Sequence, residues 1–403
     1  MKTELTQAYL DSAHGQRADS ILRSCVHCGF CNATCPTYQL LGDELDGPRG
    51  RIYQIKQVLE GQPATRSLQT HLDRCLTCRA CETTCPSGVD YHSLLDIGRE
   101  LVEEQVPRPF QQTLLRRLLV SALSHTQRAR LLFATARLFR PLLPACLKSK
   151  IPGKKRLPRP SPGAHTRRML LLDGCVQPAA APQINDAARI VFDKLGIELQ
   201  TVAQAGCCGA LQHHLGDSHG GLDKARANID AWWPAIEAGA EAIVITSSGC
   251  APMIKDYGNL LSNDAVYAER AARISSLAKD VSEIVSVEDI NSLPSIKGRR
   301  IAFHSPCTLQ HGQQLSGVVE SLLTRLGFKL VMVKDAHLCC GSAGTYSIFQ
   351  PKLSRQLLEN KLTALQDKQP EMISTANIGC LLHLQQAADV PVKHWLELIT
   401  DHI

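Results

Sequence analysis

The chain has 403 residues, of which 44% are hydrophobic, 4% aromatic and 20% charged. This length predicts two to three domains, and the composition excludes a disordered or fibrous chain. The unusual feature is a count of 17 cysteines. An odd number in a chain this long argues against a disulfide-linked secreted scaffold and favours metal ligation or redox chemistry in a reducing compartment.

The N-terminal part contains a cysteine motif twice, as CVHCGFCNATCP at 25–36 and CLTCRACETTCP at 75–86. Apolar spacing at 51–61 and 93–105 predicts helices around both motifs. In two-cluster ferredoxins, three cysteines of C-x2-C-x2-C-x3-C-P ligate one cubane and the fourth ligates the other. This rule assigns Cys25, Cys28, Cys31 and Cys85 to cluster 1, and Cys75, Cys78, Cys81 and Cys35 to cluster 2. Structural zinc is the alternative, although it needs neither the third cysteine nor the repeated Cys-Pro.

Arg79 of the second motif stands where the first motif has Gly29. Positive charge close to a cluster favours its reduced, more negative state. One hypothesis is therefore that cluster 2 has the higher potential, and the alternative is that Arg79 is a solvated surface residue.

The following segment is strongly basic, and the net charge of +6 hides this. Residues 108–168 contain 15 Lys or Arg and no Asp or Glu, which leaves 29 basic and 38 acidic residues elsewhere. Helical spacing from Phe110 to Leu119 and from Leu131 to Phe139 predicts helices, and the last twenty residues before 166 are expected to be an extended linker. Two interpretations remain open: docking on an anionic membrane face, or a helical pair packed on its own domains.

The C-terminal half contains a second, different repeat. Cys175 precedes Cys207-Cys208-Gly209 and Cys250, and with the same first spacing Cys307 precedes Cys339-Cys340-Gly341 and Cys380. Short apolar runs predict strands at 169–173, 198–202, 242–246, 299–303, 328–333 and 371–375. Helical patterns at 187–196 and 222–239 complete βαβ units with parallel sheets. Each cysteine follows a predicted strand, so we expect the cysteines to gather at the carboxyl edges of the sheets.

The expected fold is therefore α+β and multidomain. It comprises a helical two-cluster domain at 1–105, a basic linker at 106–165, and two repeated α/β domains at 166–295 and 296–403. The four cysteines of each repeat suffice for a cubane, a zinc ion or a more open cluster. His213, His214 and His304 are candidates for imidazole ligands or hydrogen-bonded structural residues, and Cys146 has no partner in any motif.

No GxGxxG after a strand and no Walker A motif occurs, so we expect neither flavin nor nicotinamide on this chain, and electron transfer in place of substrate oxidation. The absence of an apolar leader and of any run of 18 apolar residues predicts no signal peptide and no transmembrane helix.

The strings SCVHCGFCNATCPTYQLLGDELDGPRGRIY, HLDRCLTCRACETTCPSGV and NIDAWWPAIEAGAEAI resemble the iron–sulfur subunits of bacterial glycolate oxidases, in which CCG domains follow a two-cluster ferredoxin module. The resemblance implies FAD-containing partner subunits that oxidise glycolate to glyoxylate. It also implies a quinone or other acceptor, and a peripheral position on the cytoplasmic side of the inner membrane. The chain departs from the full CCG pattern of heterodisulfide reductases, because Ser247 and Asn377 replace the first cysteine of the final CxxC.

Two other functions remain open. The chain resembles cluster subunits of glycerol-3-phosphate and lactate dehydrogenases and CCG-type disulfide or quinone reductases, because these relatives share the architecture. A zinc-containing binding module whose basic segment holds phospholipid or nucleic acid is a further alternative. We expect no nucleic-acid partner.

Overall fold

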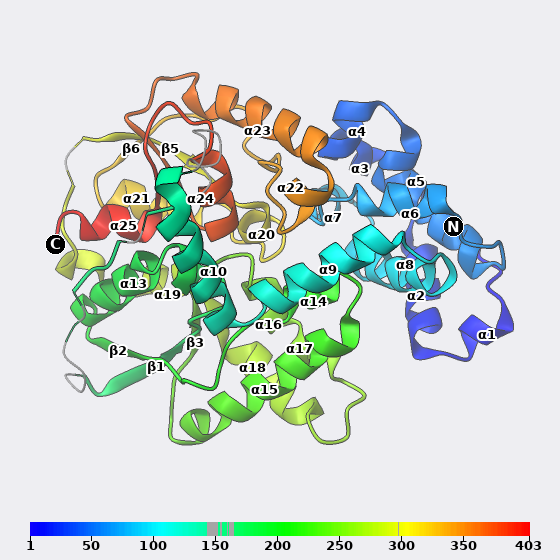
Figure 1. Ribbon diagram of the computed structural model, residues 1–403, viewed down its shortest axis with the longest axis horizontal. Coiled ribbons are helices and arrows are strands. Elements are labelled where there is room, and N and C mark those ends of the chain that lie inside the picture. Colours follow the sequence, from blue (N-terminus) through cyan, green and yellow to red (C-terminus); the bar gives the residue numbers. More distant parts are fainter. Residues whose placement is uncertain (143–151, 154, 159, 161–164, 297) are drawn as a thin grey trace.

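Figure 1 shows the computed structural model, which describes residues 1–142, 152–153, 155–158, 160, 165–296 and 298–403. The N-terminal part is helical, as expected, and its buried core includes Leu22, Ile55, Leu72 and Leu94. Its elements are α1 (Gln7–Leu10), α2 (Ala13–Ser24), α3 (Phe30–Ala33), α4 (Pro36–Leu41), η1 (Glu44–Asp46), α5 (Pro48–Leu59), α6 (Arg66–Asp73), α7 (Ala80–Thr84) and α8 (Tyr91–Gln105). Each cysteine motif begins in the loop before a short helix, α3 or α7, and continues through that helix to the residues after it.

The basic segment begins with two helices, α9 (Phe110–Leu123) and α10 (Thr126–Phe139), followed by η2 (Arg140–Leu142). The helices expected there are confirmed. They pack on each other, and α10 also packs on the first repeat. Most of the expected extended linker, including Cys146, lies outside the described residues.

Each C-terminal repeat contains a four-stranded parallel sheet. The first, in the order β2-β1-β3-β4, consists of β1 (Arg167–Leu171), β2 (Ile197–Gln200), β3 (Ile243–Ile245) and β4 (Ala278–Asp280). The second, in the equivalent order β6-β5-β7-β8, consists of β5 (Arg300–His304), β6 (Lys329–Leu330), β7 (Met372–Thr375) and β8 (Val392–His394). Six of these strands were expected from apolar runs, and the edge strands β4 and β8 were not.

Helices cover both faces of the sheets. The first repeat has α12 (Gln177–Ala180), α13 (Gln183–Lys194), α14 (Ala210–His214), α15 (Ser218–Glu237), α16 (Ala251–Lys255), α17 (Tyr257–Leu260), α18 (Ala268–Leu277), α19 (Val281–Val287) and η3 (Ile290–Ser292). The second has α20 (Cys307–Gln310), α21 (Val318–Arg325), α22 (Tyr346–Phe349), α23 (Pro351–Gln366), α24 (Ile378–Leu384) and α25 (Trp395–Thr400).

The two repeats share one hydrophobic core, which joins Val191 and Phe192 of α13 to Trp395 and Leu398 of α25. Helix α13 packs on α25, and α19 packs on α21. Because α13 is the counterpart of α21 and α19 that of α25, these two contacts are the same contact made in both directions. The repeats are therefore related by a pseudo-twofold axis, as the subunits of an isologous dimer are.

Candidate metal centres

The two N-terminal cysteine loops have the same backbone conformation. The second and fourth residues after the first cysteine have positive φ in both motifs: 59° at His27, 86° at Gly29, 53° at Thr77 and 62° at Arg79. Three of these residues are not glycine, and left-handed conformations of this kind are concentrated at functional sites. In the second loop, the Thr77 amide donates to Cys75 Sγ over 3.4 Å.

Each loop encloses a small hollow that the fourth cysteine of the other motif also lines. The hollow of the first loop is lined by Cys25, Cys28, Cys31 and Cys85, and also by Cys81. The hollow of the second loop is lined by Cys75, Cys78, Cys81 and Cys35. The fold thus brings together both sets of four cysteines that the sequence predicts.

These thiols lie where a bound cation is needed to hold them as thiolates. Burial, together with the neighbouring cysteines, raises the pKa of Cys31 to about 11. Burial, followed by the charge of other cysteines, also raises the pKa values of Cys78 and Cys81. Positively charged iron offsets both effects, and soft thiolates are the ligands that iron–sulfur clusters take. The donor sets therefore fit the two clusters.

The two sites differ in exposure. Cys28 is exposed, and the neighbouring side chains of Val26 and Phe30 are 67% and 63% exposed. Cys78 and Cys81 of the second site are buried. The Cys25 site thus lies at the surface and the Cys75 site in the interior.

The structure places a buried cation beside the second site that sequence reasoning missed. Arg51 is 1% exposed, lines the hollow with Cys35 and Cys75, and has Asp46 as its counter-ion at 3.5 Å. Arg79, in contrast, is bound by Glu82 at 2.7 Å. Arg79 is therefore not the solvated residue of the alternative interpretation, but Glu82 offsets its charge.

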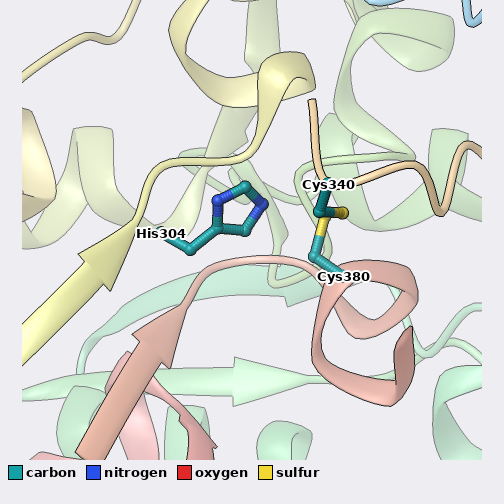
Figure 2. Close-up of side chains that lie close together, drawn as sticks. All are labelled: His304, Cys340 and Cys380. Carbon is teal, nitrogen blue, oxygen red and sulfur yellow. The ribbon is translucent and has the colours of Figure 1, made fainter. Parts of the chain in front are cut away.

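The cysteines of the second repeat form a chain of neighbouring sulfur atoms. Cys307 Sγ lies 3.9 Å from Cys339 Sγ, and Cys340 follows Cys339 directly. Cys340 and Cys380 lie with His304 in a group whose ligand atoms are all within 4.8 Å of one another. Figure 2 shows the imidazole of His304 beside the side chains of Cys340 and Cys380. The three residues come from three separate segments of the chain. The proximity expected at the carboxyl edge of the sheet is therefore observed.

The first repeat groups its cysteines in the same way, with Cys207 between Cys175 and Cys208, and Cys208 close to Cys250. Hydrogen bonds from Cys175 and Cys208 lower the pKa of Cys207. The turn between α9 and α10 lies against this site, because Thr126 Oγ1 donates to the Gly174 carbonyl over 2.9 Å. Basic groups also approach it, since Lys224 lies 3.4 Å from His125 and close to Cys207.

The three candidate histidines lie in two different places. His304 joins the cysteines of the second repeat. His213 and His214 instead line a large cavity between the first repeat and helix α8. There, His213 Nε2 lies 3.3 Å from Asp96 Oδ2, and this pairing holds the pKa of Asp96 below its usual range, at about 2, against the opposing effect of burial.

The N-terminal part and the second repeat meet directly at their sulfur sites. Cys78 packs in one buried cluster with Cys307 and Cys339, and the charge of Cys307 contributes to the raised pKa of Cys78. Next to this contact, Thr83 Oγ1 and His311 Nδ1 are hydrogen-bonded at 2.9 Å. The second ferredoxin site therefore adjoins the group of cysteines in the second repeat.

Comparison with known proteins agrees with this architecture. Residues 21–89 match the family model of the 4Fe-4S dicluster domain, and residues 169–255 and 301–385 match that of the cysteine-rich CCG domain. The fold is also similar to the crystal structure of a hypothetical protein from Helicobacter pylori, with a TM-score of 0.57 at 9% identity over 98% of this chain and 73% of that one. The fold and its sulfur sites define a multidomain iron–sulfur protein.

Two relatives show to which family of iron–sulfur proteins the chain is similar. The chain is 55% identical to the glycolate oxidase iron-sulfur subunit of Escherichia coli over 99% of this chain and 98% of the relative. It is 29% identical to a probable glycolate oxidase iron-sulfur subunit of Bacillus subtilis over 96% of this chain and 93% of the relative. The chain belongs to the family of glycolate oxidase iron–sulfur subunits.

Proposed function

We propose that this chain is the electron-transfer subunit of a glycolate-oxidising complex whose partner subunits hold the flavin. The observation that supports this function best is the contact of Cys78 with Cys307 and Cys339, which makes the ferredoxin sites and the second repeat continuous. Iron–sulfur clusters, when bound, supply reversible electron transfer over a wide range of potentials. The proposed ligands are the two N-terminal sets of four cysteines and the four cysteines of each repeat.

The surface position of the Cys25 site favours it as the point of entry. Val26, Phe30 and Tyr53 are exposed there, and the Tyr53 ring lies beside that of His27 in a tilted arrangement, at 6.1 Å between ring centroids. An exposed apolar patch around a redox site is typical of a docking surface for a partner. We assign this patch to the flavoprotein subunit.

The interior position of the Cys75 site favours it as the second station. Leu76 and Ala80 of the ferredoxin loop pack with Tyr346 and Leu357 of the second repeat in one buried cluster. This buried junction holds the two groups of ligands next to each other. The second repeat therefore receives electrons from the Cys75 site.

The test compares Cys78→Ser with Cys28→Ser in the complex with its flavoprotein subunits. After reduction with glycolate, Cys78→Ser is expected to leave the Cys25 site reducible while the centres of the repeats stay oxidised. Cys28→Ser is expected to block reduction of the Cys25 site and of the repeats. Reduction of the repeats at the wild-type rate in Cys78→Ser contradicts the relay, and a colourless chain containing zinc in place of iron contradicts the function as a whole.

We also propose that the α9–α10 pair docks on an anionic membrane face and gives access to a quinone. Among the described residues, no helix has the length and apolar character needed to span a bilayer. The pair and the following η2 do expose several large apolar side chains: Phe110, Leu114, Leu115, Leu118, Leu131, Leu132, Leu138, Phe139 and Leu142. Exposed Arg117 and Arg128 lie among them. Arg108 and Arg116 do not contribute, because both bind Asp73.

This surface suits interfacial binding, in which apolar side chains enter the lipid and arginines contact headgroups. The turn of the pair touches the Cys175 site through Thr126, so a quinone at the membrane would lie close to the first repeat. The proposed position is therefore peripheral, on the cytoplasmic side of the inner membrane.

Vesicle flotation tests this docking with the full chain and vesicles containing phosphatidylglycerol. Leu118→Glu and Leu131→Glu are expected to weaken binding at least tenfold, and added salt is expected to weaken it as well. Val287→Glu is the matched control, because Val287 is 81% exposed outside the pair. Binding that resists salt, or that all three variants reduce equally, contradicts the proposal.

A further inference from the structure

The strongest unexplained feature of the molecule is the imidazole of His304. The side chain is 2% exposed at the end of β5, and both ring nitrogens are buried without a hydrogen-bond partner in the described structure. A buried polar atom left unpaired costs about 1–3 kcal/mol. Most buried polar groups are paired, so an imidazole with two unpaired nitrogens calls for a ligand.

The imidazole lies close to two cysteine sulfurs of the second repeat. His304, Cys340 and Cys380 place one ligand atom each within 4.8 Å of the others, and all three residues are buried. Cys380 Sγ also accepts from Asn377 Nδ2 at 3.5 Å, and Cys340 also contacts the Cys339 side chain and the Ser342 backbone, whereas His304 has no such partner in the described structure. A nitrogen and two sulfurs at these separations form one side of a coordination site.

The first repeat provides a comparison within the same chain. The position equivalent to His304 is Leu172, which is buried in an apolar core. Thr375, the residue paired with His304 across β5 and β7, corresponds to Ile245, which lies in the same core as Leu172. The histidine and the threonine are thus polar replacements found in the second repeat alone.

The threonine has the chemistry that orients a ligating imidazole. Its hydroxyl is buried and has no partner in the described structure. A ligating histidine usually gives its second ring N–H to a neighbouring oxygen. A hydroxyl on the adjacent strand, paired in register with His304, is suited to that role.

We propose that His304 is a ligand of the iron–sulfur centre held by Cys307, Cys339, Cys340 and Cys380, and that the centre of the first repeat has no imidazole ligand. This inference rests on the proposed function, which places such a centre in the second repeat. Replacement of a thiolate by an imidazole raises the potential of an iron–sulfur centre. The second repeat would therefore attract electrons from the adjacent Cys75 site.

The test uses the full chain, reconstituted without oxygen and labelled with ¹⁵N-histidine. Pulsed EPR of the reduced protein is expected to show a strong nitrogen coupling that changes with the label and disappears in His304→Leu, which introduces the residue of the first repeat. His311→Gln is the matched control. His311 is a buried histidine of the same repeat whose two ring nitrogens contact Thr83 and the His337 carbonyl, both at 2.9 Å, so the coupling is expected to persist.

A second variant allows for loss of the centre in His304→Leu. His304→Cys is expected to retain iron, to lack the nitrogen coupling and to have a lower midpoint potential. If the centre gives no EPR signal, the ⁵⁷Fe Mössbauer spectrum of the same samples decides: His304→Leu must alter one iron site that His311→Gln leaves unchanged.

The outcomes separate the two proposals. More than eight irons per chain with no histidine-derived coupling, or with a coupling that persists in His304→Leu, overturns the assignment of His304 alone. Only eight irons per chain and no centre beyond two cubanes overturns the proposed function of the second repeat as well, since each cubane takes four irons.

Discussion

Ser247 Oγ donates a hydrogen bond of 2.9 Å to Asn377 Oδ1, although the two residues occupy the same position in the two repeats. A contact between equivalent residues occurs only next to the axis that relates the repeats. The two positions at which the sequence lacks the first cysteine of CxxC are therefore not isolated losses. Together they form a polar bridge, which continues through Asn377 Nδ2 to Cys380 Sγ at 3.5 Å.

Removal of Asn377 from this bridge is expected to destabilise the protein more than removal of Ser247. Ser247→Ala removes one hydrogen bond and is expected to cost about 0.5–1.5 kcal/mol. Asn377→Ala leaves the buried Ser247 hydroxyl and the Gly249 amide unpaired and is expected to cost about 1–3 kcal/mol. Urea unfolding of the reconstituted chain measures both values. Equal costs, or additive costs in the double variant, argue against a shared bridge.

The potential of the Cys75 site is expected to depend more on Arg51 than on Arg79. Arg51 is fully buried beside Cys35 and Cys75, whereas Glu82 offsets the charge of Arg79. Arg51→Gln is therefore expected to lower the midpoint potential of this site, and Arg79→Gln to lower it less. EPR-monitored redox titration compares the two variants. A larger fall in Arg79→Gln would favour the hypothesis drawn from the sequence.

His92 is expected to make stability fall between pH 6.5 and 9. Burial alone would lower the pKa of His92, but Asp90 and Glu82 raise it to about 9. The charged form is therefore favoured in the folded protein, and its contribution is complete below pH 6.5 and lost as the pH rises through 9. The expected loss is about 2–3 kcal/mol.

Unfolding free energies at pH 6 and pH 9 test this dependence, with His92→Gln as the comparison. The variant is expected to be less stable than the wild type at pH 6 and closer to it at pH 9. If wild type and variant differ in unfolding free energy by the same amount at both pH values, His92 does not titrate in this range. Glu82 also accepts from the backbone amide of residue 92 at 2.7 Å, a bond that the variant keeps.

The glycine after each cysteine pair is expected to tolerate no side chain. Gly209 and Gly341 have φ of 91° and 87°, and an added Cβ would lie 2.6 Å from the Gly221 carbonyl oxygen and 2.7 Å from that of Ser354. Alanine at either position is expected to cost about 2–4 kcal/mol, since the left-handed conformation alone costs about 1–2 kcal/mol.

Gly239→Ala is the control for conformation without a clash, because Gly239 has φ of 95° and open space around it. Its expected cost is the conformational part alone, about 1–2 kcal/mol. Thermal unfolding and iron content check all three variants. If the three variants lose the same stability, the close approach of the backbone at Gly209 and Gly341 adds nothing to the cost of the substitution.

The motifs predicted the architecture because cysteine spacing and apolar runs are local. The edge strands β4 and β8 escaped notice because each has three residues and a charged or polar side chain, as in Lys279 and Lys393, so no apolar run marks them. Their pairing comes from the neighbouring strands β3 and β7, which the sequence reveals only after the fold is known.

The sequence predicts which residue types form the candidate site, but it does not predict which of these residues lie close together. The contact of Cys78 with Cys307 joins residues far apart in the chain, and no motif records it. His213, His214 and His304 looked alike in the sequence, since burial distinguishes them and burial depends on the whole fold. Arg51 was overlooked because a single arginine in a helix is normally exposed.

The cover that α23 places over the second repeat sets an order of events during biogenesis. Leu353 and Leu357 of this helix pack with Cys307 and Cys339, which are buried. Assembly proteins that deliver iron and sulfide cannot reach thiols enclosed in this way. We therefore expect the centre to be inserted while the C-terminal helices are still open, so that maturation of the cofactor and the last step of folding are one process.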